Sequence, residues 1–253
     1  MDLGLKNKVA LVTGASRGLG RTISLALAAE GAQVAVNYRR EAEKAKQLVE
    51  EIQQTHGVAA TSVGADVASE SDVKRMFQQV EDELGHVQVL INNAAICPTR
   101  KVKDMPFGEW AETVAVNLHG TFLACREMVQ RLVSAKKTGR IVNVASQAAF
   151  RGSTTGHAPY DASKGGMVSF TISLAREVAE IGIAVNAVAP GMMLTEMTRD
   201  TLKANEHKYL GRIPLRRIAE TDEIADVVVF LASERASYMT GATVDVSGGM
   251  LMR

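Results

Sequence analysis

The sequence predicts an α/β protein in which a doubly wound parallel sheet of about seven strands carries helices on both faces. Three observations lead to this prediction. Short apolar runs alternate with longer amphipathic stretches along the chain. The apolar runs are rich in Val, Ile and Ala at consecutive positions, which is typical of strands that helices cover on both sides. The 253 residues contain no linker and no internal repeat, so we expect a single domain over 1–253.

The elements follow from these runs. The expected strands are VALVT (9–13), QVAVNY (33–38), VAATSVGAD (58–66), VQVLINNA (87–94), RIVNVAS (140–146), IAVNAVAP (183–190) and TVDVSGG (243–249). Ser69, followed three residues later by Asp72, predicts the start of a helix over 70–84, and Thr221 with acidic residues behind it predicts the start of another. The polar segment 193–217 follows a strand, and we expect it to be a mobile substrate lid.

Composition and charge exclude several classes of function. With 29 Lys+Arg against 28 Asp+Glu, the net charge of +1 provides no field that would attract nucleic acid or an anionic membrane. The N-terminal residues MDLGLKNK include no apolar segment, so we expect a cytoplasmic protein without a leader. The two cysteines, Cys97 and Cys125, and the five histidines form no ligand-spaced cluster, so no metal site is expected.

The first expected strand leads into a glycine-rich loop, TGASRGLG (13–20), and then into a helix-compatible run. Glycines at 14, 18 and 20 let the backbone turn sharply and approach a pyrophosphate, which the helix N-terminus then stabilises. The spacing is G-x-x-x-G-x-G, which differs from the general dinucleotide fingerprint. A glycine-rich turn without a ligand is the alternative for this loop taken alone.

The end of the second strand bears on which nucleotide is bound. An NAD-specific site is expected to place a carboxylate there, and this chain has Asn37-Tyr38-Arg39-Arg40 instead. Arg39, with Arg17 in the glycine loop, could pair with a 2′-phosphate through charge-assisted hydrogen bonds. The sequence therefore favours NADP(H) over NAD(H), with NAD(H) still possible. The alternative is that Arg39 and Arg40 only solvate the start of a helix.

Taken together, the motifs resemble those of the short-chain dehydrogenase/reductases. The resemblance extends from Lys8 nearly to the C-terminus. It includes TGASRGLG (13–20), Asp66, NNAA (92–95), Asn117 in VAVNLHG, Ser146, YDASK (160–164), PG (190–191) and Thr195. It implies a Rossmann-type fold and an enzyme, an oxidoreductase that acts on a carbonyl or an alcohol with a nicotinamide cofactor.

The resemblance implies a catalytic set of Asn117, Ser146, Tyr160 and Lys164. Tyr160 and Lys164 lie four apart, so one helix face presents both. A free tyrosine has a pKa of about 10, and we expect the ammonium to lower it so that the phenol can exchange a proton with substrate. The implied cofactor contacts are Gly14, Ser16, Arg17, Gly18, Leu19, Gly20, Arg39, Asp66, Val67, Asn93, Ala94, Tyr160, Lys164, Pro190, Gly191 and Thr195.

The family mechanism assigns the other roles. Ser146 would hydrogen-bond the substrate oxygen, Lys164 would also hold the nicotinamide ribose, and Asn117 would anchor a water that supplies protons to the lysine. Singly, each residue also fits a structural role, such as a helix-surface pair for Tyr160 and Lys164. A cofactor-binding protein without catalysis is the rival from another class, and it predicts a broken Tyr/Lys pair. We interpret His157, beside the site, as a loop-packing residue.

Two features depart from the family pattern. Ala95 stands where the family usually has glycine, a change we expect to be tolerated. Ser146 and Tyr160 are one residue further apart than is usual, which implies an insertion within QAAFRGSTTGHAP (147–159). We expect the insertion to change the substrate-side loop and to leave the catalytic set in place.

Within the family, RIPLRRIAETDEIADVVVFLAS (212–233) and TGATVDVSGGML (240–251) resemble 3-oxoacyl-acyl-carrier-protein reductases. A 3-oxoacyl thioester is the expected substrate; a free alcohol, a sugar, a cyclic ketone or a coenzyme A thioester is the alternative. Lys136 and Lys137 could supply part of a basic patch for an acidic carrier, but Ile181 stands where a second basic residue is expected. The family also implies a homotetramer built on helices around 107–134 and 158–181.

Overall fold

The computed structural model describes residues 2–153, 155–196 and 207–252. Seven strands form one sheet in the order β3-β2-β1-β4-β5-β6-β7, and every neighbouring pair runs parallel. The strands are β1 (Val9–Val12), β2 (Gln33–Tyr38), β3 (Ala60–Gly64), β4 (Val87–Asn92), β5 (Gly139–Val144), β6 (Ile183–Pro190) and β7 (Thr243–Val246). The predicted seven-stranded parallel sheet is confirmed.

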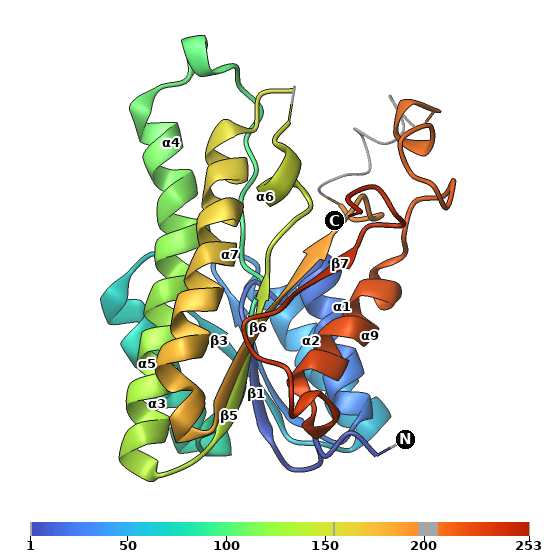
Figure 1. Cartoon of the computed structure of the whole chain (residues 1–253). Helices are drawn as coiled ribbons and strands as arrows, with labels where there is room; N and C mark the ends of the chain where they lie inside the picture. The colour runs from blue at the N-terminus through green and yellow to red at the C-terminus, as the bar shows by residue number, and fades with distance from the viewer. Residues whose placement is uncertain (1, 154, 197–206, 253) are drawn as a thin grey trace.

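Helices cover both faces of this sheet (Figure 1). One face carries α1 (Gly18–Ala29), α2 (Ala42–His56) and α9 (Thr221–Ala232). The other carries α3 (Glu70–Leu84), α4 (Phe107–Val114), α5 (Gly120–Ala135) and α7 (Ala158–Val178). A short helix, α6 (Ala148–Arg151), follows β5.

The strand side chains explain why both faces are covered. On β1, Ala10 and Val12 pack into the apolar core beside α1 and α9, whereas Val9 and Leu11 pack into the core beside α3 and α5. All four are buried. A strand with no polar face must bury both sides, and this is the condition that the consecutive Val, Ile and Ala residues predicted.

Two helix starts were expected from capping residues. The Ser69 hydroxyl accepts a hydrogen bond from the backbone N–H of Asp72, and α3 begins at Glu70, as predicted. The start at Thr221 is confirmed, but the N-cap is the preceding residue, Glu220. Its side chain and that of Glu223 form a reciprocal capping box.

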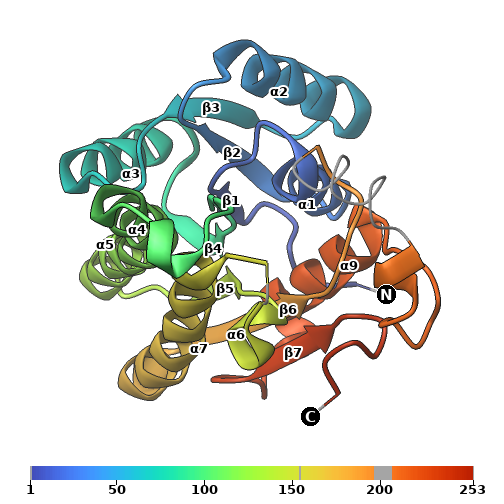
Figure 2. The ribbon, with the colours of Figure 1, turned by 90° about the horizontal axis from the view of Figure 1, so that it is seen from above.

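The strand order determines where a ligand can bind. β1 lies between β2 and β4, so the chain moves outward in one direction from β1 to β3 and in the other from β4 to β7. At such a reversal the loops after the two central strands diverge and leave a crevice at their carboxyl ends. The view from above shows β1 and β4 at the middle of the molecule (Figure 2). No helix within the described ranges is long and apolar enough to cross a membrane.

Candidate active site

The loop between β1 and α1 has the backbone that the glycine pattern predicted. Gly14 and Gly18 have φ values of 62° and 54°, in the left-handed region that favours glycine. At Gly20, a Cβ atom would lie 2.5 Å from Nδ2 of Asn93, so no larger residue fits without displacing the neighbouring loop. The loop ends at the N-terminus of α1, whose free N–H groups favour an anion.

Side chains from two other strands hold this loop in place. Nδ2 of Asn93 donates to the carbonyl oxygens of Thr13 and Gly14 at 2.9 and 3.1 Å. The N–H groups of Asn93 and Ala94 donate to the Thr13 hydroxyl at 3.0 and 3.1 Å. Asn37, at the end of β2, accepts from the Gly14 N–H at 3.2 Å, a role that sequence reasoning missed. A polar residue inside the otherwise apolar run QVAVNY was the available signal.

Ser146, Tyr160 and Lys164 come together at the carboxyl end of β5. Ser146 follows this strand, and its hydroxyl lies close enough to Tyr160, on the first turn of α7, to lower the pKa of the phenol. Lys164 is 1% exposed, and its ammonium lies 5.7 Å from the centre of the Tyr160 ring. The Tyr/Lys pair is therefore intact, which the non-catalytic alternative does not predict.

The electrostatics of this pair differ from the expectation that Lys164 lowers the pKa of Tyr160. Burial raises the pKa of Tyr160 above its ordinary value, and the neighbouring Cys97 and Asp161 raise it further, while the Ser146 hydrogen bond lowers it. Burial also lowers the pKa of Lys164 to about 8. Desolvation dominates both groups because the low-dielectric surroundings disfavour a phenolate and an ammonium alike.

Asn117 lies in a π-helical segment, Ala115–His119, that joins α4 to α5. Its Oδ1 accepts from the Ile96 N–H at 2.9 Å, and its Nδ2 donates to the Ile96 carbonyl at 3.0 Å and to the Ser163 hydroxyl at 3.0 Å. Ser163 in turn donates to the carbonyl of Tyr160 at 2.7 Å. Asn117 thus connects the segment after β4 with the turn of α7 that carries Tyr160. Its role in holding a water stays a prediction.

The extra residue between Ser146 and Tyr160 does not separate the two side chains, since Ser146 still influences the pKa of Tyr160. That loop is bonded to the segment after β4: the Arg100 N–H donates to the Gly156 carbonyl at 2.8 Å. Nδ1 of His157 lies 3.0 Å from the Pro98 carbonyl oxygen, which can only accept, so Nδ1 carries the proton. The interpretation of His157 as a loop-packing residue agrees with this bond.

The remaining expected cofactor residues lie at or after the carboxyl ends of β1, β3 and β6. Thr195 approaches the glycine loop, since a Cβ added to Gly18 would lie 3.9 Å from Cβ of Thr195. A Cβ on Gly191, after β6, would lie 2.7 Å from Cα of Ser247, so glycine is needed where β6 and β7 end side by side. Ser16 is half-buried in the glycine loop, and Leu19, Val67 and Pro190 are buried beneath the crevice.

The structure does not bring the two arginines to a common partner. Nε of Arg39 lies 2.9 Å from Oδ2 of Asp66, on the side of β3. Arg17 pairs instead with Glu196 at 3.3 Å and with Glu41 at 3.7 Å. Both guanidinium groups are about half exposed.

Ala95, where the family usually has glycine, lies outside the left-handed region of backbone conformation. Its Cβ therefore causes no backbone strain, in agreement with the expectation that this change is tolerated.

The expected lid, 193–217, is described only at its two ends, because 197–206 lie outside the described residues. Met193 forms a parallel bridge with Ala219, and the Leu215 N–H donates to the Gly248 carbonyl at 3.1 Å. These bonds attach both ends to the body of the protein. The predicted mobility between them stays a prediction.

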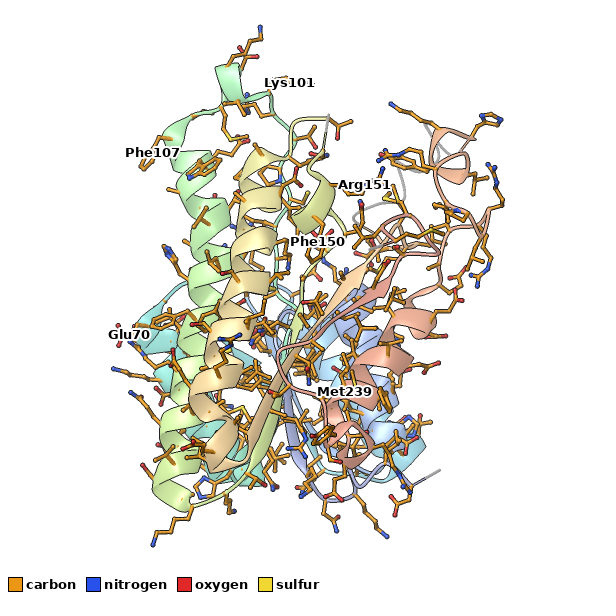
Figure 3. The ribbon with its side chains drawn as sticks, in the orientation of Figure 1. Glu70, Lys101, Phe107, Phe150, Arg151 and Met239 are labelled. Carbon is orange, nitrogen blue, oxygen red and sulfur yellow. The ribbon has the colours of Figure 1, made fainter. Side chains whose placement is uncertain are left out.

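Figure 3 shows several side chains at the end of the molecule where α7 begins. Phe150 and Arg151 from α6, and Lys101 and Phe107 from the segment before and at the start of α4, all lie there. The Arg151 guanidinium donates to the Met250 carbonyl and so joins α6 to the C-terminal segment. The role of residues 147–159 on the substrate side stays a prediction.

The residues present fit a dinucleotide cofactor. Gly14 and Gly18 provide the close backbone approach that a pyrophosphate needs at a helix N-terminus. The Lys164 ammonium has three donors, and within the described chain only the Val144 carbonyl, at 2.6 Å, accepts from it. Two donors are left for ribose hydroxyls. Among the described residues, no group of three or more His, Cys, Asp or Glu side chains could hold a metal ion.

Comparisons with known proteins agree with this geometry. A family model described as Enoyl-(Acyl carrier protein) reductase matches residues 14–251. A Staphylococcus epidermidis protein named 3-oxoacyl-(acyl-carrier-protein) reductase FabG is 43% identical over 246 residues, 97% of this chain and 100% of the relative. An Aquifex aeolicus protein of the same name is 39% identical over 250 residues, 99% of this chain and 100% of the relative.

Two solved structures share the fold over their whole length. One is titled a short-chain type dehydrogenase/reductase from Mycobacterium marinum, with a TM-score of 0.95 and 31% identity over 100% of this chain and 98% of the other. The second, a candidate gluconate dehydrogenase from Agrobacterium tumefaciens, has a TM-score of 0.94 and 32% identity over 100% of this chain and 99% of the other.

Proposed function

Because this chain belongs to the short-chain dehydrogenase/reductase family of oxidoreductases, we propose that it reduces the ketone of a 3-oxoacyl thioester to a secondary alcohol with NADPH. The observation that carries the proposal is the placement of Ser146 and Tyr160 beside the buried Lys164, at the carboxyl end of β5. The names of the Staphylococcus and Aquifex relatives support the choice of a 3-oxoacyl substrate.

Each side chain has a definite part in the proposed reaction. When bound, the nicotinamide supplies the hydride that reaches the carbonyl carbon. Tyr160 donates its phenolic proton to the carbonyl oxygen, and Ser146 donates a hydrogen bond to the same oxygen. The proton leaves a phenolate on Tyr160, which the Lys164 ammonium, 5.7 Å from the ring centre, stabilises. Lys164 also holds the ribose with its remaining donors.

We further propose NADP(H) rather than NAD(H) as the cofactor. Arg17 and Arg39 lie on the loop and at the strand end that face the adenosine half of a cofactor bound in this crevice. Either guanidinium can pair with a 2′-phosphate. Asp66, which pairs with Arg39, accepts from the Ala68 N–H at 3.0 Å and so fixes the turn beside that half.

A sugar acid is the second candidate substrate, because one structural relative is described as a candidate gluconate dehydrogenase. The proposed catalytic set serves both reactions, since an alcohol oxidised by NADP+ returns its proton to Tyr160. The rim residues 147–159 and the segment 193–217 would decide between them.

A comparison of substrates tests the proposal. With NADPH, acetoacetyl-coenzyme A should give a higher kcat/KM than crotonyl-coenzyme A, and gluconate with NADP+ should be turned over more slowly than either. A higher kcat/KM for crotonyl-coenzyme A would point to enoyl reduction, the reaction named by the family model. A higher value for gluconate would replace the thioester with a sugar acid.

The position of the expected basic patch bears on whether a carrier protein presents the acyl thioester to the site. Lys136 and Lys137 precede β5, and Ile181 precedes β6, where Gly139 pairs with Ile183 at the amino ends of the strands. Tyr160 lies at the opposite end of α7, a helix of 21 residues that is about 30 Å long. A carrier on this patch would not face the Tyr160 of its own subunit. We therefore propose an acyl thioester substrate and leave carrier docking as a prediction.

A homotetramer is the proposed assembly. Phe122 and Val133 on α5 and Ile172 on α7 are large apolar side chains left exposed. Phe122 also contacts Phe170 edge to face, with ring centres 6.1 Å apart. Light scattering should give four times the chain mass of 27.1 kDa, and a particle of the chain mass would rule the assembly out. A cytoplasmic location stays a prediction.

A further inference from the structure

Four charged side chains gather at the mouth of the glycine loop. Arg17 is the N-cap of α1, and Lys44 and Glu41 lie at the start of α2. The fourth, Glu196, follows β6 and comes from a distant part of the chain. Its Oε2 atom lies 3.3 Å from NH1 of Arg17 and 3.6 Å from Nζ of Lys44. One carboxylate oxygen is therefore held between two cations from different elements.

The two carboxylates of the cluster have different structural reasons to be there. Glu41 and Lys44 are three residues apart at a helix start and form a local pair at 3.3 Å, and Glu41 also lies 3.7 Å from Arg17. Glu196 is 179 residues from Arg17 and reaches the cluster only because its neighbour Thr195 lies over Gly18. Burial raises the pKa of Glu196, but the Arg17 hydrogen bond and the charge of Lys44 bring it below its ordinary value. Glu196 is thus an anion near neutral pH.

We propose that Glu196 is a specificity-determining residue that competes with the 2′-phosphate of the cofactor for Arg17 and Lys44. The inference rests on the proposed use of NADP(H). Guanidinium and ammonium groups accept carboxylate and phosphate oxygens by the same charge-assisted hydrogen bonds, so only one anion can use them fully. Lys44 thereby becomes a further cofactor cation beside Arg17 and Arg39, one that the sequence did not indicate.

The competition has a limited strength. The side chains of Arg17, Lys44 and Glu196 are 52%, 47% and 49% exposed, and exposed ion pairs are weak. A phosphate carries close to two charges and outcompetes a single carboxylate. Glu196 therefore lowers the affinity for NADP(H) without preventing its binding. NAD(H) has no 2′-phosphate and does not need these two cations, so its affinity should not depend on Glu196.

The test compares binding of NADP+ and NAD+ by calorimetry for the wild type, Glu196→Gln and Glu43→Gln. Glu43 is the matched control, because it lies on α2, pairs with Lys46 at 3.0 Å and, within the described chain, forms no ion pair with Arg17 or Lys44. Glu196→Gln should bind NADP+ about 3- to 10-fold more tightly, while NAD+ binding changes less than about 2-fold. Glu43→Gln should leave both affinities unchanged.

A second variant tests whether the gain in NADP+ affinity depends on Arg17 and Lys44. In a Lys44→Met background, Glu196→Gln should improve NADP+ binding less than it does in the wild type, since one of the two contested partners is gone. Unchanged or weaker NADP+ binding by Glu196→Gln, or an equal gain for NAD+, would overturn the inference. The proposal that the cofactor is NADP(H) is tested separately, by the binding measured for the wild type. Tighter binding of NAD+ than of NADP+, or binding of neither, would overturn that proposal, whatever the variants show.

Discussion

Tyr160→Phe should lower kcat for acetoacetyl-coenzyme A reduction by about 10²- to 10⁴-fold, the usual contribution of a positioned general acid. The substitution removes only the hydroxyl that is hydrogen-bonded to Ser146. The ring stays in place on α7, and Lys164 keeps its bond to the Val144 carbonyl. The affinity for NADP+ should therefore be retained, so the loss should be confined to kcat. Steady-state kinetics and calorimetry with NADP+ measure the two quantities.

Tyr238→Phe is the control for this result. Tyr238 is fully exposed, at 104% of the reference area, and lies between α9 and β7, outside the crevice. Its loss of a hydroxyl should leave kcat unchanged. If Tyr160→Phe kept more than about a tenth of the wild-type kcat, another group would have to supply the proton and the assignment of Tyr160 would be wrong.

Lys164→Met should abolish most of the activity and also change how stability depends on pH. Burial lowers the pKa of Lys164 from 10.5 to about 8, so the native state releases this proton at lower pH than the unfolded chain does. Between about pH 8 and 10.5 the unfolded state binds more protons, and the free energy of unfolding of the wild type rises with pH. Over that window the gain relative to the Met variant should reach about 3 kcal/mol.

Urea unfolding at about pH 7 and about pH 10 measures this difference. Lys103→Met is the matched control, since its side chain is 82% exposed, and its difference from the wild type should not change over the same window. The pH comparison is preferable to a single stability value, because the Met side chain also leaves the Val144 carbonyl without its donor. A pH-independent difference for Lys164→Met would contradict a buried ammonium at this position.

The sequence was most informative where local patterns decide the structure. Seven apolar runs predicted seven strands, Ser69 predicted the start of α3, and the glycines of 13–20 predicted the left-handed turns at Gly14 and Gly18. These features depend on backbone preferences and on which faces must be buried, and both are visible in a single sequence. The catalytic set needed the family resemblance in addition, because its members are spread over 48 positions from Asn117 to Lys164.

The sequence was less informative where side chains from distant segments meet. It suggested that Lys164 lowers the pKa of Tyr160, but burial of both groups dominates in the folded chain. It paired Arg17 and Arg39 with a phosphate, and it did not indicate that they pair with Glu196 and Asp66 in the folded chain. Burial and long-range pairing are properties of the packed chain, so spacing alone does not reveal them.

In the proposed reaction, NADPH delivers a hydride to the 3-keto carbon while Tyr160 supplies the proton. Reduction of acetoacetyl-coenzyme A with NADPH deuterated at the transferable position of its nicotinamide, followed by mass spectrometry of the product, shows where each hydrogen comes from. We expect 3-hydroxybutyryl-coenzyme A with one deuterium, bound to C3. A product without deuterium at C3, or no reduction of the ketone, would contradict the account.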